Sequence, residues 1–212
     1  MLFSDLEFVH ENDYPWEEAS MESCIFEDHS VCVYLWDDGQ FGEESEDDVK
    51  SQGPVKVTAY YDVSEKIVDF HREAFKHFID NAKSYEKRLL AYLADIAKNN
   101  IELAMGEADS PEIIKFIEKH KLYGIDGLKK QISWSGITLY DHGWEGVGFV
   151  TFDFECAWDT EHGISILMHK GKIIAEGGEA EFTGRGDSLI KHAEYSQKHT
   201  AGYDIELPYG SS

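Results

Sequence analysis

The densest cluster of side chains that could do chemistry is the octapeptide Cys-Ala-Trp-Asp-Thr-Glu-His-Gly in the last third of the sequence. Its Asp159, Glu161 and His162 place two carboxylates and an imidazole within four positions, and divalent cations accept these groups as ligands. Asp141 and His142 follow the preceding predicted strand and could complete such a site. A divalent metal is therefore possible, in a metal-binding domain or a metal-dependent enzyme, and we predict no other cofactor.

The same segment also has a purely structural interpretation. Strand alternation would send Asp159 and Glu161 to one side and His162 to the other, which splits the donor set. In this interpretation Trp158 anchors the core, Asp159 makes an Asx-type turn, and Gly163 adopts a positive φ angle. His162 then hydrogen-bonds to the backbone. Turns of this kind are common, so we favour the structural interpretation and keep metal binding as the alternative.

Other catalytic signatures are missing from the sequence. It has no Gly-x-Ser-x-Gly nucleophile motif and no glycine-rich phosphate loop after a strand. Cys156 has His162 as a nearby base, but its predicted strand position faces the core, where a thiol is inert. Cys24, Cys32 and Cys156 show no Cys-x-x-Cys spacing, which predicts reduced thiols and no zinc site. An enzyme is therefore not the expected class.

The charge of the chain limits its partners. It carries 19 Lys and Arg against 42 Asp and Glu, a formal net charge of −23 over 212 residues. Phosphate groups would be repelled, which argues against nucleic acid and anionic membranes as partners and favours a basic protein. No segment offers the roughly 20 apolar residues of a spanning helix, and the first residues do not resemble a secretory signal. We expect a cytoplasmic protein.

The negative charge is concentrated near the N-terminus, where residues 1–62 contain 17 acids and two bases. The densest acids are candidate partner-binding residues: Asp37, Asp38, Glu43, Glu44, Asp47 and Asp48. A solvated loop explains such a block, and so does an acidic surface that meets a cationic partner. Trp16 and Trp144 stand beside glutamates, a combination typical of interface hot spots, although both rings could equally pack on the sheet.

Hydrophobic periodicity predicts the elements that position these residues. The predicted strands span 31–36, 55–63, 132–140, 147–156, 164–168 and 172–175, with turns at 141–143 and 159–163. One long helix is predicted to start at the cap Ser64, with a break near 81–84, and a short one at Ser110. The fold predicted is α+β, an antiparallel sheet with a long helix and a short helix packed on one face, ending in a β-meander.

We expect one α+β domain over residues 1–183, with an acidic N-terminal portion, and a C-terminal extension over residues 184–212. Within this domain the sequence resembles an uncharacterised bacterial family whose members carry a Trp-Asp-x-Glu-His-Gly signature near the C-terminus. Here the signature is Trp158–Gly163, between the strand Phe152–Cys156 and the hairpin that follows. The resemblance covers roughly residues 30–182. It implies a fold and a motif without catalytic residues, and some members are associated with toxin–immunity loci.

These observations predict an acidic cytosolic binding protein, of the immunity type, that masks a basic partner. Its acidic segment would steer the partner electrostatically, and its aromatic side chains would then dock. The alternative is a metal-binding domain or metal-dependent enzyme centred on Asp159, Glu161 and His162.

Overall fold

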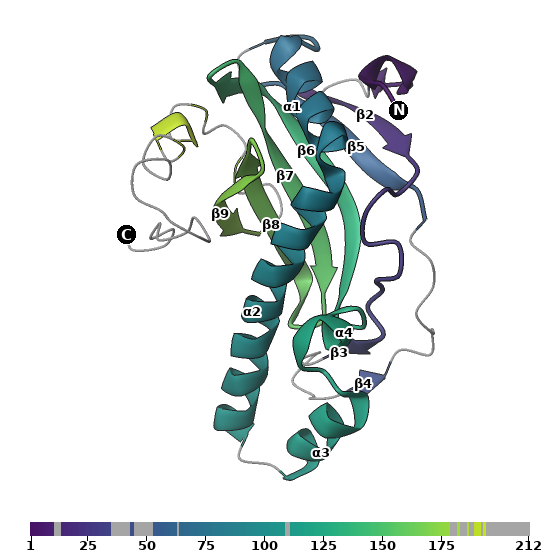
Figure 1. Ribbon diagram of the computed structural model, residues 1–212, viewed down its shortest axis with the longest axis vertical. Helices are drawn as coiled ribbons and strands as arrows, with labels where there is room; N and C mark the ends of the chain where they lie inside the picture. The colour runs from purple at the N-terminus through teal and green to yellow at the C-terminus, as the bar shows by residue number, and fades with distance from the viewer. Residues whose placement is uncertain are drawn as a thin grey trace.

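The computed structural model describes residues 1–10, 14–34, 43–44, 53–62, 64–108, 111–178, 182, 186, 189–191 and 193 (Figure 1). The strands are β1 (Val9–His10), β2 (Trp16–Met21), β3 (Val33–Tyr34), β4 (Glu43–Glu44), β5 (Val55–Tyr60), β6 (Ile132–Trp144), β7 (Val147–Cys156), β8 (Asp159–His169) and β9 (Lys172–Gly177). The helices are η1 (Phe3–Asp5), α1 (Asp69–Asp80), α2 (Ala82–Ala108), α3 (Pro111–His120) and α4 (Gly124–Leu128). Among these helices none is long and apolar enough to cross a membrane.

The main sheet has seven strands in the order β1-β2-β5-β6-β7-β8-β9, and β3 and β4 form a separate two-stranded ribbon. The predicted α+β class and the C-terminal meander are confirmed. All neighbouring strands of the main sheet are antiparallel except β5 and β6, which are parallel. Helices α1 to α4 lie between these two strands in the chain. They form the crossover that a parallel pair requires, so that β5 and β6 start from the same end of the sheet.

Helices α1 and α2 lie across one face of the sheet, one following the other (Figure 1). The predicted break is confirmed, because α1 ends at Asp80 and α2 begins at Ala82. The predicted cap Ser64 is wrong: its hydroxyl donates to the Lys66 carbonyl, and α1 begins only at Asp69. There the N–H of Val68 donates to Nδ1 of His71, so the imidazole accepts a hydrogen bond from the backbone at the start of the helix.

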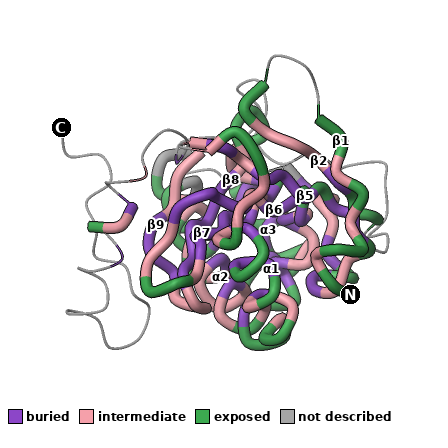
Figure 2. The backbone as a smooth tube through the Cα atoms, turned by 90° about the horizontal axis from the view of Figure 1, so that it is seen from above, coloured by how far each residue is buried: buried purple, intermediate pink, exposed green. Residues whose placement is uncertain are grey.

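The face under α1 and α2 is the main hydrophobic core. Phe78 from α1 packs edge-on against Trp134 and Phe152 of the sheet, and all three side chains are fully buried. Tyr85 from α2 contacts the same Phe152 ring. Figure 2 shows the central strands as buried and the two helices on one side of them. Apolar residues at alternate positions of the central strands therefore line the face under the helices.

Two of the predicted turns are wrong. Residues 141–143 lie within β6, and the chain reverses at Glu145 and Gly146, whose φ angles are 50° and 80°. Residues 159–163 open β8, and the reversal lies before them at 157–158. The predicted hairpin at 170–171 is confirmed, because both residues have positive φ angles as a two-residue hairpin turn requires.

On the other face, a second apolar cluster lies over β6 to β9. Phe182, Leu189 and Ala193, from the part of the C-terminal region that the structure describes, pack against Leu167 and Ile174. Phe182 also lines a groove on this face, which crosses β2 and β5 to β8. The boundary between a domain at 1–183 and an extension at 184–212 stays a prediction.

Candidate functional site

The predicted motif forms the start of β8. One carboxylate oxygen of Asp159 accepts a hydrogen bond from the backbone N–H of His162, at 3.0 Å, and lies 3.2 Å from the ring Nδ1 of the same residue. Trp158 is half-buried and packs between the main core and the apolar cluster under α3. These contacts are local and bind the motif to itself and to the core.

Gly163 is the position where the motif depends on backbone geometry. Its φ angle is 62°, and a Cβ atom there would lie 2.4 Å from the carbonyl oxygen of Phe154. The register between β7 and β8 shifts next to it, between Phe154 and Cys156. Only glycine allows the two backbones to approach so closely at this angle, so Gly163 forms the irregular start of the hairpin.

The structure separates the two halves of the predicted metal set. Asp141 and His142 lie beside the Val147–Val150 end of β7, whereas Asp159 pairs with Cys156. Cys156 lies six positions after Val150 along β7, a distance of about 20 Å. Among the described residues, no group of three or more His, Cys, Asp or Glu side chains is placed to hold a metal ion. The structure therefore gives no support to the metal alternative.

The groove lies on the face of the sheet opposite α1 and α2, and three rows of side chains cross it. The first row is aromatic, because Trp16 pairs with Tyr60 and Tyr60 with Tyr140 across β2, β5 and β6. Two positions along, Glu18 is followed by Thr58, Thr138 and Thr151 on successive strands. A further two positions along, the third row holds Lys56, Gly136, Asp153 and Ser165.

Two hollows open along these rows. One has a volume of about 230 Å³ and is lined by the aromatic and threonine rows together with Phe182. The other, of about 390 Å³, is lined by the start of β8, including Asp159, Glu161 and His162. Both hollows share Lys56, Asp153 and Ser165, so they meet at the third row and form one groove. The predicted motif thus borders a groove that the sequence did not reveal.

The polar groups at the meeting point are held by one another. Asp153 accepts a 2.5 Å hydrogen bond from the Ser165 hydroxyl and a longer one, 3.4 Å, from Thr138. Lys56 lies 3.3 Å from the Glu18 carboxylate. Burial, and then the nearby Asp153 charge, raise the pKa of the Tyr140 hydroxyl, which keeps that group neutral. The groove therefore carries fixed carboxylates beside neutral hydroxyls.

The structure places the predicted partner-binding residues in different regions. Trp16 lines the groove and stacks on Tyr14 with 4.6 Å between ring centroids. Trp144 ends β6, packs against the His169 ring and accepts a hydrogen bond from it through its carbonyl, so it lies outside the groove. Asp37, Asp38, Asp47 and Asp48 lie outside the described residues, and Glu43 and Glu44 are described only as β4.

Cys24, Cys32 and Cys156 all lie among the described residues, and none of these three cysteines forms a disulfide. Cys156 is buried, and burial raises the pKa of its thiol to about 12. A thiol with such a pKa is protonated at neutral pH and is a poor nucleophile. The Cys156–His162 pair considered from the sequence has no geometric support, since His162 is turned to Asp159 and its side chain is 69% exposed.

A family model described as a domain of unknown function, DUF6985, matches residues 11–183. The chain belongs to this family. The match contains β2, β5 and β6 to β9, and therefore every strand that lines the groove of this DUF6985 domain. No curated protein and no solved structure matches the chain.

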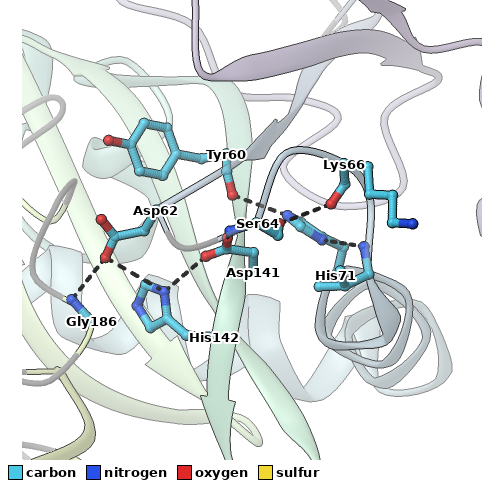
Figure 3. Close-up of polar contacts among 9 residues, drawn as sticks. Tyr60, Asp62, Ser64, Lys66, His71, Asp141, His142 and Gly186 are labelled. Carbon is cyan, nitrogen blue, oxygen red and sulfur yellow. Dashed lines mark hydrogen bonds and ion pairs between the residues drawn. The ribbon is translucent and has the colours of Figure 1, made fainter.

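A second polar cluster of this DUF6985 domain lies where β5 and β6 end, and it includes two of the predicted metal ligands (Figure 3). The ring Nδ1 of His142 lies 3.2 Å from Asp141 and 3.9 Å from Asp62. The other Asp141 oxygen accepts from the N–H of Ser64, and Asp62 accepts from the N–H of Gly186. The cluster thus ties the β5–α1 connection and the C-terminal region to β6.

The sequence reasoning missed Asp62, Asp153 and the threonine row. A signal for the row was present, since Lys56, Thr58 and Tyr60 alternate with apolar residues along β5. Alternation predicts a polar face, but it does not show which strands pair or in which register. Asp153 and Thr138 become neighbours only when β6 pairs with β7.

Proposed function

We propose that this DUF6985 chain is an acidic, cytoplasmic binding protein whose groove receives a basic segment of a protein partner. The observation that carries the proposal is the groove on the sheet face opposite the helices. It is hollowed, bordered by aromatic rings and lined by carboxylates. A shaped hollow that combines large aromatic anchors with fixed polar groups has the composition of a binding surface.

The charge of the groove supports a basic occupant. The side chains that line it include five carboxylates and one lysine: Glu18, Asp153, Glu155, Asp159, Glu161 and Lys56. The whole chain carries −23, so a cationic segment would be attracted over a long range and then meet carboxylates at short range. A polyanion would be repelled at both stages.

We further propose that the acidic segment Asp37–Asp48 steers the partner toward the groove. Exposed charges act mainly on the rate of encounter, whereas buried contacts act on dissociation. Immunity proteins that mask a cationic toxin surface would operate in this manner, and such a toxin is the partner class that we propose. The aromatic anchor in this scheme is Trp16, which lines the groove.

A peptide-display selection tests the proposal even though the partner is unidentified. A random library is selected on the wild-type chain alone, and the selected peptides are then measured on Thr138→Arg, which places a cation and a large side chain in the centre of the groove. We expect selected peptides to be rich in Lys and Arg and to bind more weakly at high salt. Selection of neutral or acidic peptides, or equal binding to Thr138→Arg, would overturn the proposal.

The steering step has its own test. We expect replacement of Asp37, Asp38, Asp47 and Asp48 by Asn to lower the association rate of a selected peptide and to flatten its dependence on salt. The dissociation rate should stay unchanged, because steering ends once the complex has formed. Stopped-flow measurements at several salt concentrations separate the two rates. An unchanged association rate would contradict steering.

A further inference from the structure

We infer that the hollow at Asp153 is a receptor for a single arginine side chain of the bound segment. This inference rests on the proposed function and specifies its chemistry. It follows from the order of the three rows across the sheet, from the hydrogen bonds of Asp153, and from the position of Lys56.

The row order selects a long side chain. Successive rows lie two residues apart on each strand, which is about 7 Å. A ligand backbone resting on Trp16 and Tyr60 must therefore send its side chain across the threonine row to reach Asp153. Thr58 and Thr151 are buried, so they form a floor over which the aliphatic part of such a side chain can lie.

Asp153 sits at the far end of this floor with its carboxylate orientation fixed. The Ser165 hydroxyl donates to one oxygen and the Thr138 hydroxyl to the other. Beside it on β6 stands Gly136, which has no side chain to fill the row between Asp153 and Lys56. An oriented carboxylate at the end of an unfilled row suits a planar guanidinium, which makes two parallel hydrogen bonds to such a group.

Lys56 provides a test of whether the site prefers a cationic or an anionic ligand. Its ammonium lies 3.3 Å from Glu18 and its side chain is 53% exposed, in the same row as Asp153. A cationic ligand would be repelled by this lysine, whereas an anionic ligand would use it. Lys56→Met should therefore strengthen the binding of an arginine and weaken the binding of a carboxylate or phosphate.

The probe is the peptide acetyl-Gly-Gly-Arg-Gly-Gly-amide, followed by two-dimensional ¹H–¹⁵N NMR of the full chain. Matched peptides with citrulline or lysine in place of arginine remove the charge or the planar shape. We expect the arginine peptide to shift the Trp16 indole signal and the amides of Thr138 and Asp153, and the citrulline peptide to shift neither. Asp153→Asn should weaken binding roughly tenfold or more, and Lys56→Met should strengthen it severalfold.

Glu145→Gln is the matched control, since it removes an equally charged carboxylate that is paired with Lys170 at a hairpin turn outside the groove. It should leave the affinity unchanged. If Asp153→Asn fails to fold, Lys56→Met alone tests the arginine site. A loss of structure would weaken binding, so it cannot explain stronger binding by this variant.

The outcomes separate this inference from the function on which it rests. Equal binding of the citrulline or lysine peptide, or an Asp153→Asn variant with unchanged affinity, overturns the arginine site. If the display-selected basic peptides still bind the groove in that case, the proposed function stands. If no basic peptide binds the groove at all, both fail.

Discussion

The two faces of the central sheet are made by the same strands, and they differ in almost every physical respect. On β6, Ile137 is buried under the helices, and its neighbour Thr138 lies in the groove on the other side. On β7, Phe152 packs against Phe78 and Tyr85, while Asp153 faces the groove. Alternation along a strand thus separates residues that hold the fold from residues that are available to a partner.

The comparison predicts that the two faces determine two different properties, stability and binding affinity. Substitutions on the helix-covered face should lower stability and leave the groove's affinity unchanged in the molecules that remain folded. Substitutions in the groove should lower its affinity for the partner and change stability only slightly. The following predictions run from the largest expected effect on stability to the smallest.

Phe78→Ala should produce the largest loss. This ring is fully buried and makes edge contacts with four aromatic side chains, so truncation leaves a cavity that its neighbours cannot fill. We expect unfolding free energy to fall by about 3–5 kcal/mol, measured by urea denaturation. A loss below about 1 kcal/mol would show that the helix-covered face is not the main core.

Gly163→Ala should destabilise by up to about 3 kcal/mol, since a positive φ angle and a backbone clash act together. Gly146→Ala is the matched control, because Gly146 also has a positive φ but would place its Cβ in open space. There only the strain of about 1 kcal/mol remains. Thermal or urea unfolding compares the two. Equal losses would show that the close approach to Phe154 does not matter.

The stability of the chain should fall as the pH drops below about 6.5, the ordinary pKa of histidine. Burial lowers the pKa of His71, which donates through Nε2 to the Tyr60 carbonyl and accepts at Nδ1 from Val68. The folded state therefore holds the neutral ring, and the unfolded state takes up the proton first. The contribution of the neutral His71 ring to stability is fully present above about pH 6.5 and is lost below it. The unfolding free energy then falls by at most about 1.4 kcal/mol per pH unit for each proton.

The measurement for this prediction is unfolding by urea between neutral and mildly acidic pH. His71→Gln should flatten the pH dependence of the unfolding free energy, because it removes the buried imidazole. His29 and His169 also have pKa values lowered by burial, so a residual slope is expected in His71→Gln. An identical slope in wild type and His71→Gln would contradict the account.

Trp16→Ala should have the smallest effect on stability, about 1 kcal/mol. The ring is only half-buried and is held mainly by stacking on Tyr14 and Tyr60. Its effect on a selected basic peptide should be much larger, at least about tenfold in affinity, as for other aromatic interface anchors. Calorimetry measures both quantities. A large loss of stability with unchanged affinity would place Trp16 with the core residues.

The fold was predictable from local patterns to a large extent. The 3.6-residue apolar stripe predicted the helices that cover one face, and alternation predicted β5 and the meander. The strands β1 and β2 were missed because Trp16–Met21 contains two glutamates and no apolar run. The start of α1 was misplaced because His71, three residues after Val68, replaces a hydroxyl cap.

The groove was not predictable, and the reason is register. Its rows join residues from five strands, β2 and β5 to β8, that are up to about 150 positions apart in the chain, and no local pattern contains that information. The Trp158–Gly163 motif was visible, and the Asp159 turn and the positive φ angle of Gly163 agree with its favoured structural role. The expected hydrogen bond from the His162 ring to the backbone was wrong, because this ring lies against the Asp159 carboxylate. Its place beside the groove depends on the hairpin turn, which lies earlier in the chain than the turn residues at 159–163 indicate.

The most direct test of the central claim compares adjacent residues on opposite faces of β6. The affinity of one display-selected basic peptide is measured by calorimetry for wild type, Thr138→Arg and Ile137→Val. The account predicts a loss of at least about tenfold for Thr138→Arg and no change for Ile137→Val, which should lose only about 1 kcal/mol of stability. Wild-type affinity in folded Thr138→Arg would contradict it.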